Sequence, residues 1–187
     1  MNLNDIWKDD NLIKTLKNGG VAVMPTDTLY GIVGQADNET VVNRIYTIRK
    51  RNPEKPCVIL IGNIDELEKF GIALNENQKN VVEQIDEPTS FVMDCLNEKF
   101  TYLHRGTKTL AFRIPSSQAL QNLLLEIGPL IAPSANTEAL PPAENIQEAK
   151  NYFDTSVDLY MDAGSNSGKA SKIIKLHKDG SITVIRK

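Results

Sequence analysis

Short apolar runs alternate with amphipathic segments along the whole length of this 187-residue chain. A run of about four apolar residues between polar or turn-forming residues is typical of a strand buried in a sheet. A segment whose apolar residues recur every third or fourth position is typical of a helix packed on that sheet. These patterns predict strands at 21–24, 29–33, 57–61, 90–93, 110–114, 130–132 and 157–161, and helices at 4–17, 39–50, from Asn63 onward, 75–85, 116–127 and 143–153.

The end of the chain has the pattern of a hairpin. Residues 172–176 and 181–185 are joined around Asp179-Gly180, a dipeptide typical of tight turns. Strands that alternate with helices imply the α/β class, here a layered domain with a twisted, mixed β-sheet flanked by helices. The chain has no repeat of fixed period and no linker rich in glycine and serine. We therefore expect a single domain over residues 1–187, whose last segment, about 20 residues, forms a C-terminal β-ribbon.

The composition excludes several classes of protein. Hydrophobic residues make up 41% and charged residues 24%, which are globular values rather than those of disordered or collagen-like chains. No apolar run approaches the roughly 20 residues that span a bilayer, and the acidic, polar N-terminus is unlike a secretory signal. Two cysteines, Cys57 and Cys95, are too few for a disulfide framework or a thiolate zinc site. We expect a soluble, cytoplasmic protein.

The charge is unevenly distributed. The net charge of −3 argues against general binding of nucleic acid, yet cations concentrate in three basic islands. These islands are residues 44–55, 99–113 and 169–187, with local net charges of +4, +4 and +5. If the fold brings them together, they would focus positive potential on a compact polyanion such as a nucleoside triphosphate. If it does not, each island is a solvated face.

The first candidate site follows a predicted strand that ends at Pro25. Thr26 and Thr28 offer short hydroxyls in a turn, and Tyr30 offers a flat apolar body with a polar tip. Ligands commonly bind at the strand ends of α/β sheets, so this segment would suit a small amino acid or alcohol. The alternative is a turn stabilised by its own Asp and Thr hydrogen bonds.

Three further candidates carry charged or amide groups. Arg49 and Arg51 stand at the end of a predicted helix, where a turn can aim both at one phosphate, or where they only terminate the helix. Ser134 and Asn136 alternate in a loop after a short strand and could hold ribose or phosphate oxygens, or form an ordinary Asx turn. Arg113 ends a buried strand and needs an anion, from an acidic neighbour or a ligand.

Other features point to no chemistry. His104 and His177 have no partners at metal-ligand spacing, and we expect Cys57 to be a core residue. The phosphate-binding patterns GxxxxGK[ST] and GxGxxG are absent. The segment from Gly164 to Lys169 could contact phosphate through backbone N–H groups, but a mobile loop is the better prediction.

Five segments, in this order, resemble the YrdC-like family, the threonylcarbamoyl-AMP synthases. They are MPTDTLYG at 24–31, similar to the family's opening signature; Arg49-Lys50-Arg51 followed by Lys55, similar to its Lys-x-Arg element; the strand from Thr109 to Pro115, similar to its Arg-x-Pro strand; Ser134-Ala135-Asn136, similar to its Ser-x-Asn element; and Ser171–Ile174, similar to its late Ser-Thr-hydrophobic segment. The chain also departs from the family. Arg49 replaces a lysine, residues 86–90 keep little of a Pro-Gly-Pro-x-Thr stretch, and Glu138-Ala139 replaces Ser-Gly.

The resemblance implies a sheet around a concave basic cavity and a nucleotidyltransferase activity. Threonylcarbamoyl-AMP and pyrophosphate would be made from L-threonine, bicarbonate or CO₂, and ATP, for the tRNA modification threonylcarbamoyladenosine. It implies catalytic roles for Arg49 and Arg51; ATP contacts from Arg49, Arg51, Lys55, Thr109, Ser134 and Asn136; and threonine contacts from Thr26, Thr28, Tyr30, Arg113 and Ser171. Mg²⁺ would arrive with ATP, without a dedicated metal site or permanent cofactor. A threonylcarbamoyl transferase complex would act downstream, and weak tRNA binding would be possible.

Three alternative hypotheses about the function stay open. A non-catalytic module of the same fold could bind structured RNA, although aromatic residues amount to 6% and are few for base stacking. A related adenylate-forming enzyme could use another substrate, since the Ser-Gly and Pro-Gly pieces are lost. A scaffold role is the third, and we rank it lowest because the charged motif residues are retained.

Overall fold

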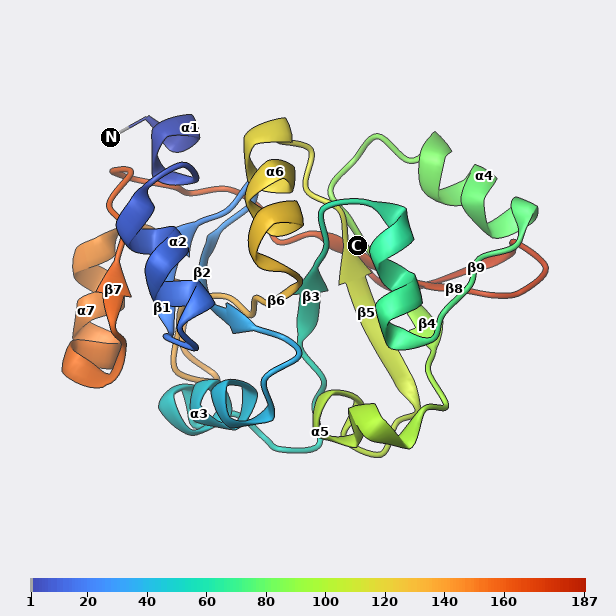
Figure 1. The fold of residues 1–187 in the computed structure, drawn as a ribbon, viewed down its shortest axis with the longest axis horizontal. Helices are drawn as coiled ribbons and strands as arrows, with labels where there is room; N and C mark the ends of the chain where they lie inside the picture. The colour runs from blue at the N-terminus through green and yellow to red at the C-terminus, as the bar shows by residue number, and fades with distance from the viewer. Residues whose placement is uncertain (1) are drawn as a thin grey trace.

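The computed structural model of this protein describes residues 2–187, and one mixed sheet of nine strands organises them (Figure 1). The strand order is β7-β1-β2-β6-β3-β5-β4-β8-β9. The strands are β1 (Ala22–Pro25), β2 (Tyr30–Gln35), β3 (Val58–Leu60), β4 (Thr89–Asp94), β5 (Thr109–Arg113), β6 (Leu130–Ile131), β7 (Leu159–Tyr160), β8 (Lys172–Leu176) and β9 (Ile182–Arg186). Strands β7 and β1, β3 and β5, and β4 and β8 pair in parallel, and the other pairs are antiparallel.

Helices cover both faces of this sheet. They are α1 (Leu3–Ile6), α2 (Asp10–Lys17), α3 (Glu39–Arg49), α4 (Glu76–Gln84), α5 (Thr101–His104), α6 (Gln118–Ile127) and α7 (Ile146–Phe153), with 3₁₀ turns η1 (Ile64–Phe70), η2 (Glu98–Phe100) and η3 (Asp154–Ser156). Helices α1, α2 and α6 lie together in front of β1 and β2 in Figure 1, over a core that contains Ala22 and Met24. Val21 and Val23 point to the opposite face and pack in a second core with residues of α3 and α7. The predicted α/β fold is confirmed.

Side-chain caps explain where the helices differ from the predictions. The helix predicted at 4–17 is two helices, because Asp9 Oδ1 accepts hydrogen bonds from the backbone N–H groups of Asn11 and Leu12 and starts α2. The helix predicted from 143 begins later, at Ile146, because Asn145 caps it. The segment after Asn63 is a 3₁₀ helix, and the short helices between 98 and 104 were not predicted.

The C-terminal hairpin is confirmed as β8 and β9, but β8 also pairs in parallel with β4. The ribbon is therefore an extension of the main sheet. To reach it, the chain crosses from β7, at one edge of the sheet, to β8, near the other (Figure 1). This crossing segment, residues 161–171, contributes Ala170 and Ser171 to the lining of the cavity described below. The single-domain organisation of residues 1–187 stays a prediction.

None of the helices between residues 2 and 187 has the length and apolar character that a bilayer crossing requires.

Candidate active site

A cavity of about 250 Å³ lies where the β1–β2 turn, the loop after α3 and the segment after β6 meet β5, β8 and β9. Four guanidinium groups line it: Arg49, Arg51, Arg113 and Arg186. No carboxylate is among the lining residues that the structure describes in 2–187. One or more arginines come from each of the three basic islands, so the fold brings the islands together.

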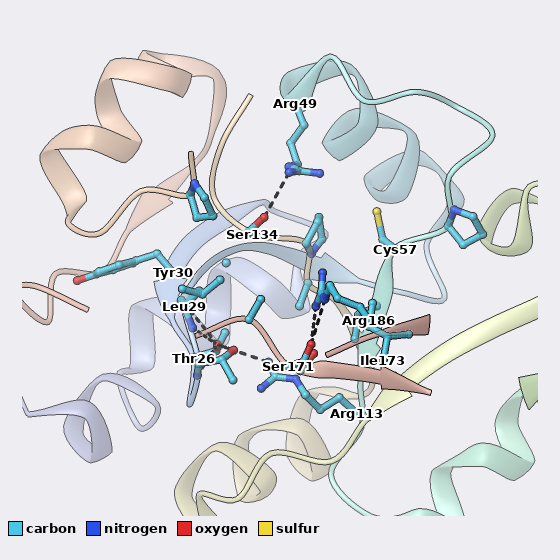
Figure 2. A pocket seen from close by; sticks show the side chains of 18 of the residues that line it. Thr26, Leu29, Tyr30, Arg49, Cys57, Arg113, Ser134, Ser171, Ile173 and Arg186 are labelled. Carbon is cyan, nitrogen blue, oxygen red and sulfur yellow. Dashed lines mark hydrogen bonds between the residues drawn. The ribbon is translucent and has the colours of Figure 1, made fainter. Parts of the chain in front are cut away.

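Arg49 is held from one side by the loop after β6. The end of α3 positions it, and its Nε and Nη2 donate to the backbone oxygen and Oδ1 of Asn136, at 3.0 and 2.9 Å. Nη2 also donates to Ser134 Oγ at 3.5 Å, a contact marked by a dashed line in Figure 2. Nη1 is shielded from solvent and has no partner among residues 2–187. Burial, and then the charge of Arg51, lower the pKa of Arg49, so an anion in the cavity would stabilise its charged form.

Arg51 lies in the loop that joins α3 to β3. Lys50 closes α3 in the left-handed conformation, with φ of 50°. Arg51 Nε then donates to the backbone oxygen of Lys55 at 3.0 Å, and Nη2 to that of Pro56 at 2.9 Å. These bonds fold the loop back on itself. They leave Nη1 as the donor that Arg51 can offer to a ligand.

Arg113 forms an ion pair with Asp27, an acidic partner that was not predicted from the sequence. Its Nη1 lies 2.5 Å from Asp27 Oδ1, and both side chains are 5% exposed. Asp27 Oδ2 also accepts the backbone N–H of Ser116. Burial lowers the pKa of Arg113, whereas Asp27 opposes that shift. The ion pair therefore orients Arg113 at the end of β5, with Nη2 at 3.5 Å from Thr26 Oγ1.

The turn between β1 and β2 supplies the hydroxyls. Thr26 Oγ1 donates to the backbone oxygen of Leu29 at 2.8 Å and lies 3.1 Å from Thr28 Oγ1. The turn is therefore stabilised by its own hydrogen bonds, and the same residues also line the cavity. The Tyr30 hydroxyl donates to Gly164 and accepts from Ala163, and its ring extends away from Arg113 (Figure 2). Burial raises the pKa of this hydroxyl, so it stays protonated.

The crossing segment packs closely on this turn. Asn166 Nδ2 donates to the backbone oxygen of Thr26 at 3.4 Å. A Cβ on Gly168 would collide with the carbonyl of Thr28, so only glycine allows this approach. The segment predicted as a mobile loop is therefore packed against this turn.

Ser171 connects the crossing segment to the C-terminal strands. Its Oγ lies 2.9 Å from Ser90 Oγ, and its backbone oxygen accepts Nη2 and Nε of Arg186 at 2.6 and 3.2 Å. Figure 2 shows Arg186 and Arg113 together beside Ser171. Burial lowers the pKa of Arg186, as it does that of Arg113.

Eight of the eleven predicted site residues line this cavity: Thr26, Thr28, Tyr30, Arg49, Arg51, Arg113, Ser134 and Ser171. Three do not. Asn136 is buried behind Arg49, with its amide nitrogen bonded to Thr137 and Leu140. Thr109 is four residues from Arg113, on the same face of β5 but outside the lining, and Lys55 is turned toward Glu138.

Arg186, Asp27 and Cys57 were not among the predicted site residues. Arg186 belongs to the third basic island, but only the pairing of β8 with β4 carries it to the cavity. Asp27 lies inside the recognised turn motif, and its partner is 86 residues away. Cys57 is buried, as predicted, yet it also lines the cavity, and burial raises the pKa of its thiol.

Ala139 adopts a conformation that favours glycine. Its φ is 70°, in the left-handed region. Ala139→Gly should raise the free energy of unfolding by about 0.5–1 kcal/mol, because relief of the left-handed strain outweighs the added freedom of the unfolded chain. Urea unfolding measures this. Ala119→Gly, inside α6, is the control and should lose about 1 kcal/mol; equal losses in both variants would contradict the prediction.

The fold and this cavity define an α/β protein with a basic pocket at its strand ends. The family model Sua5_yciO_yrdC, described as "Telomere recombination", matches residues 14–187. The chain therefore belongs to the Sua5/YciO/YrdC family, as the motifs predicted.

Relatives and solved structures agree with this family. A protein named putative threonylcarbamoyl-AMP synthase from Mycobacterium leprae is 26% identical over 163 residues, which cover 87% of this chain and 74% of that protein. A threonylcarbamoyl-AMP synthase from an Enterobacter species is 29% identical over 145 residues, or 75% and 76%. The crystal structure of Pyrococcus abyssi Sua5 complexed with L-threonine matches with a TM-score of 0.85 at 24% identity, over 97% of this chain. At this identity the match shows the shared fold. This chain spans about half of that longer protein, 54% of its length.

Proposed function

We propose that this protein is an L-threonylcarbamoyladenylate synthase, which makes threonylcarbamoyl-AMP and pyrophosphate from L-threonine, bicarbonate or CO₂, and ATP. The single observation that carries the proposal is a cavity in which four guanidinium groups gather beside threonine and serine hydroxyls, with no carboxylate among its lining residues in 2–187. That set of groups suits a polyanion and a small amino acid. The names of the relatives, and the threonine complex of Pyrococcus abyssi Sua5, support the same activity.

The reaction needs little acid–base chemistry from the protein. The amine of threonine adds to CO₂ and loses a proton, which gives a carbamate. A carbamate oxygen then attacks the α-phosphorus of ATP, the bond to the bridging oxygen breaks, and pyrophosphate leaves with that electron pair. Positioning and stabilisation of negative charge are therefore the main contributions, and arginines supply both.

We assign the nucleotide phosphates to Arg49, Arg51 and Arg186. The Nη1 atoms of Arg49 and Arg51 support this assignment, because neither has a hydrogen-bond partner in the part of the chain that the structure describes. Ser134 Oγ is close enough to Arg49 to share an oxygen of the nucleotide. We assign Asn136 the role of orienting Arg49 and not of contacting the nucleotide, since its backbone oxygen and Oδ1 accept hydrogen bonds from Nε and Nη2 of Arg49. Thr109 would be reached only by a part of ATP that extends along the face of β5 beyond the cavity.

We assign threonine to the opposite side of the cavity. Arg113 receives its carboxylate, and Thr26, Thr28 and Ser171 face its hydroxyl and amine. The pairing of Arg113 with Asp27 supports this role, because it holds the guanidinium in place before a ligand arrives. Tyr30 closes the wall through its bonds to the crossing segment.

Mg²⁺ would enter with the phosphates of ATP. No three His, Cys, Asp or Glu side chains in residues 2–187 gather as a metal site. Asp27, the acidic group nearest to Arg113, is engaged by that arginine and by Ser116. The chain's own contribution is thus to bind the phosphates, while the ion would neutralise part of their charge.

The test is incubation of the protein with ATP, bicarbonate and L-threonine, followed by pyrophosphate release and mass detection of the adenylate. Threonine-dependent pyrophosphate and the mass of threonylcarbamoyl-AMP are expected. Serine and other amino acids in parallel reactions identify a related enzyme with a different substrate. Salt-sensitive tRNA binding without any turnover would replace the enzyme by an RNA-binding module. We further propose a cytoplasmic location and a tRNA-modifying transferase complex that consumes the product.

A further inference from the structure

Glu138 joins the two loops that carry the arginine and serine motifs. Its backbone N–H donates to the carbonyl of Arg49 at 2.9 Å, at the C-terminal end of α3. Its carboxylate accepts the backbone N–H of Asn52 and lies 3.1 Å from Lys55 Nζ. Three contacts from one residue therefore bridge the segment after β6 and the loop after α3.

The same loop is held from its inner side by other groups. Tyr46 donates its hydroxyl to the backbone oxygen of Lys55 at 2.8 Å, and Arg51 Nε donates to the same oxygen. The carboxylate of Glu138 provides the outer restraint, on Asn52 and on the side chain of Lys55. The direction of Arg51 depends on this loop, because two of its nitrogens are bonded to the loop's own carbonyls.

Lys55 forms part of this restraint through its ion pair with Glu138. Its side chain is 61% exposed, it does not line the cavity, and its ammonium faces Glu138. Hydrogen bonds from Asn52 and Lys55, and the charges of Lys55 and Arg51, lower the pKa of Glu138 and keep it ionised.

We propose that Glu138 is a positioning residue for the nucleotide site, which acts by holding Asn52 and Lys55 so that Arg51 faces the cavity. Lys55 then supports ATP binding through Glu138 and without touching the phosphates. The proposal rests on the proposed function.

The test is a double-mutant cycle of Glu138→Gln and Lys55→Met. Glu138→Gln should raise KM for ATP about fivefold, the effect of one partly exposed charged contact, and leave kcat and KM for threonine within about twofold. Lys55→Met should give the same increase, and the double variant no more than either single variant. Glu126→Gln, which breaks the exposed Lys17–Glu126 pair on α2 and α6, is the matched control and should change nothing.

Two results would overturn the proposal. If the single effects multiply in the double variant, Lys55 contacts the nucleotide by itself. If Glu138→Gln leaves KM for ATP unchanged, or changes both KM values equally, Glu138 has no specific positioning role. Calorimetric titration of ATP into the wild-type protein, the two single variants and the double variant measures the same cycle as ATP affinities. Those affinities test the role of Glu138 even if the wild-type protein shows no threonine-dependent turnover, so failure of this proposal and failure of the proposed function can be told apart.

Discussion

Arg51→Ala should lower threonine-dependent pyrophosphate release by at least about 100-fold, the loss typical of one donor to a developing negative charge. Arg51 Nε and Nη2 hold the loop, and Nη1 is free for the nucleotide. The substitution removes both functions at once. A pyrophosphate assay at saturating ATP and threonine measures the loss, and urea unfolding should show a decrease in stability of only about 1–2 kcal/mol.

The matched control is Arg44→Ala, on helix α3, which precedes the loop of Arg51. Arg44 is half-buried and pairs with Asp158 at 2.6 Å, away from the cavity. Its removal should cost at most about 1 kcal/mol and leave turnover unchanged. Near-normal activity of Arg51→Ala, or equal losses in both variants, would reject the assigned role of Arg51.

Arg113→Gln should have the largest effect on stability. It leaves the carboxylate of Asp27 buried without its partner, which costs about 3–5 kcal/mol when both charges are desolvated. It should also raise KM for threonine far more than KM for ATP. Urea unfolding and the two KM values provide the measurements.

A second substitution separates these effects. Asp27→Asn in the Arg113→Gln background removes the unpaired charge, so most of the lost stability should return. KM for threonine should stay high, because the guanidinium is still missing. Recovery of threonine affinity along with stability would show that Arg113 is only structural, and equal changes in both KM values would exclude a specific role in binding threonine.

The local pattern predicted most of the elements and the family. Val21–Met24 and Leu110–Phe112 read as strands because buried strands need continuous apolar residues, and the structure contains β1 and β5 there. The helix over 39–50 was predicted from its apolar period, and in the structure Asn38 caps α3. Boundaries set by individual caps, such as Asp9 and Asn145, were missed because the apolar period runs through them.

Only some of the residues that line the cavity could be predicted from the sequence. Arg49, Arg51 and Ser134 were predicted because short motifs carry them. Arg186 was not, since β9 has no motif and reaches the cavity through strand pairings between distant segments.

The sequence by itself determined the α/β class, the family and the kinds of chemical groups available, because apolar period, turn residues and motifs are local properties of the chain. The tertiary structure alone decided that three basic islands share one cavity, that Arg113 pairs with Asp27, and that Glu138 holds Lys55. The two ion pairs join residues more than 80 positions apart, so they exist only after the sheet has fixed its strand order.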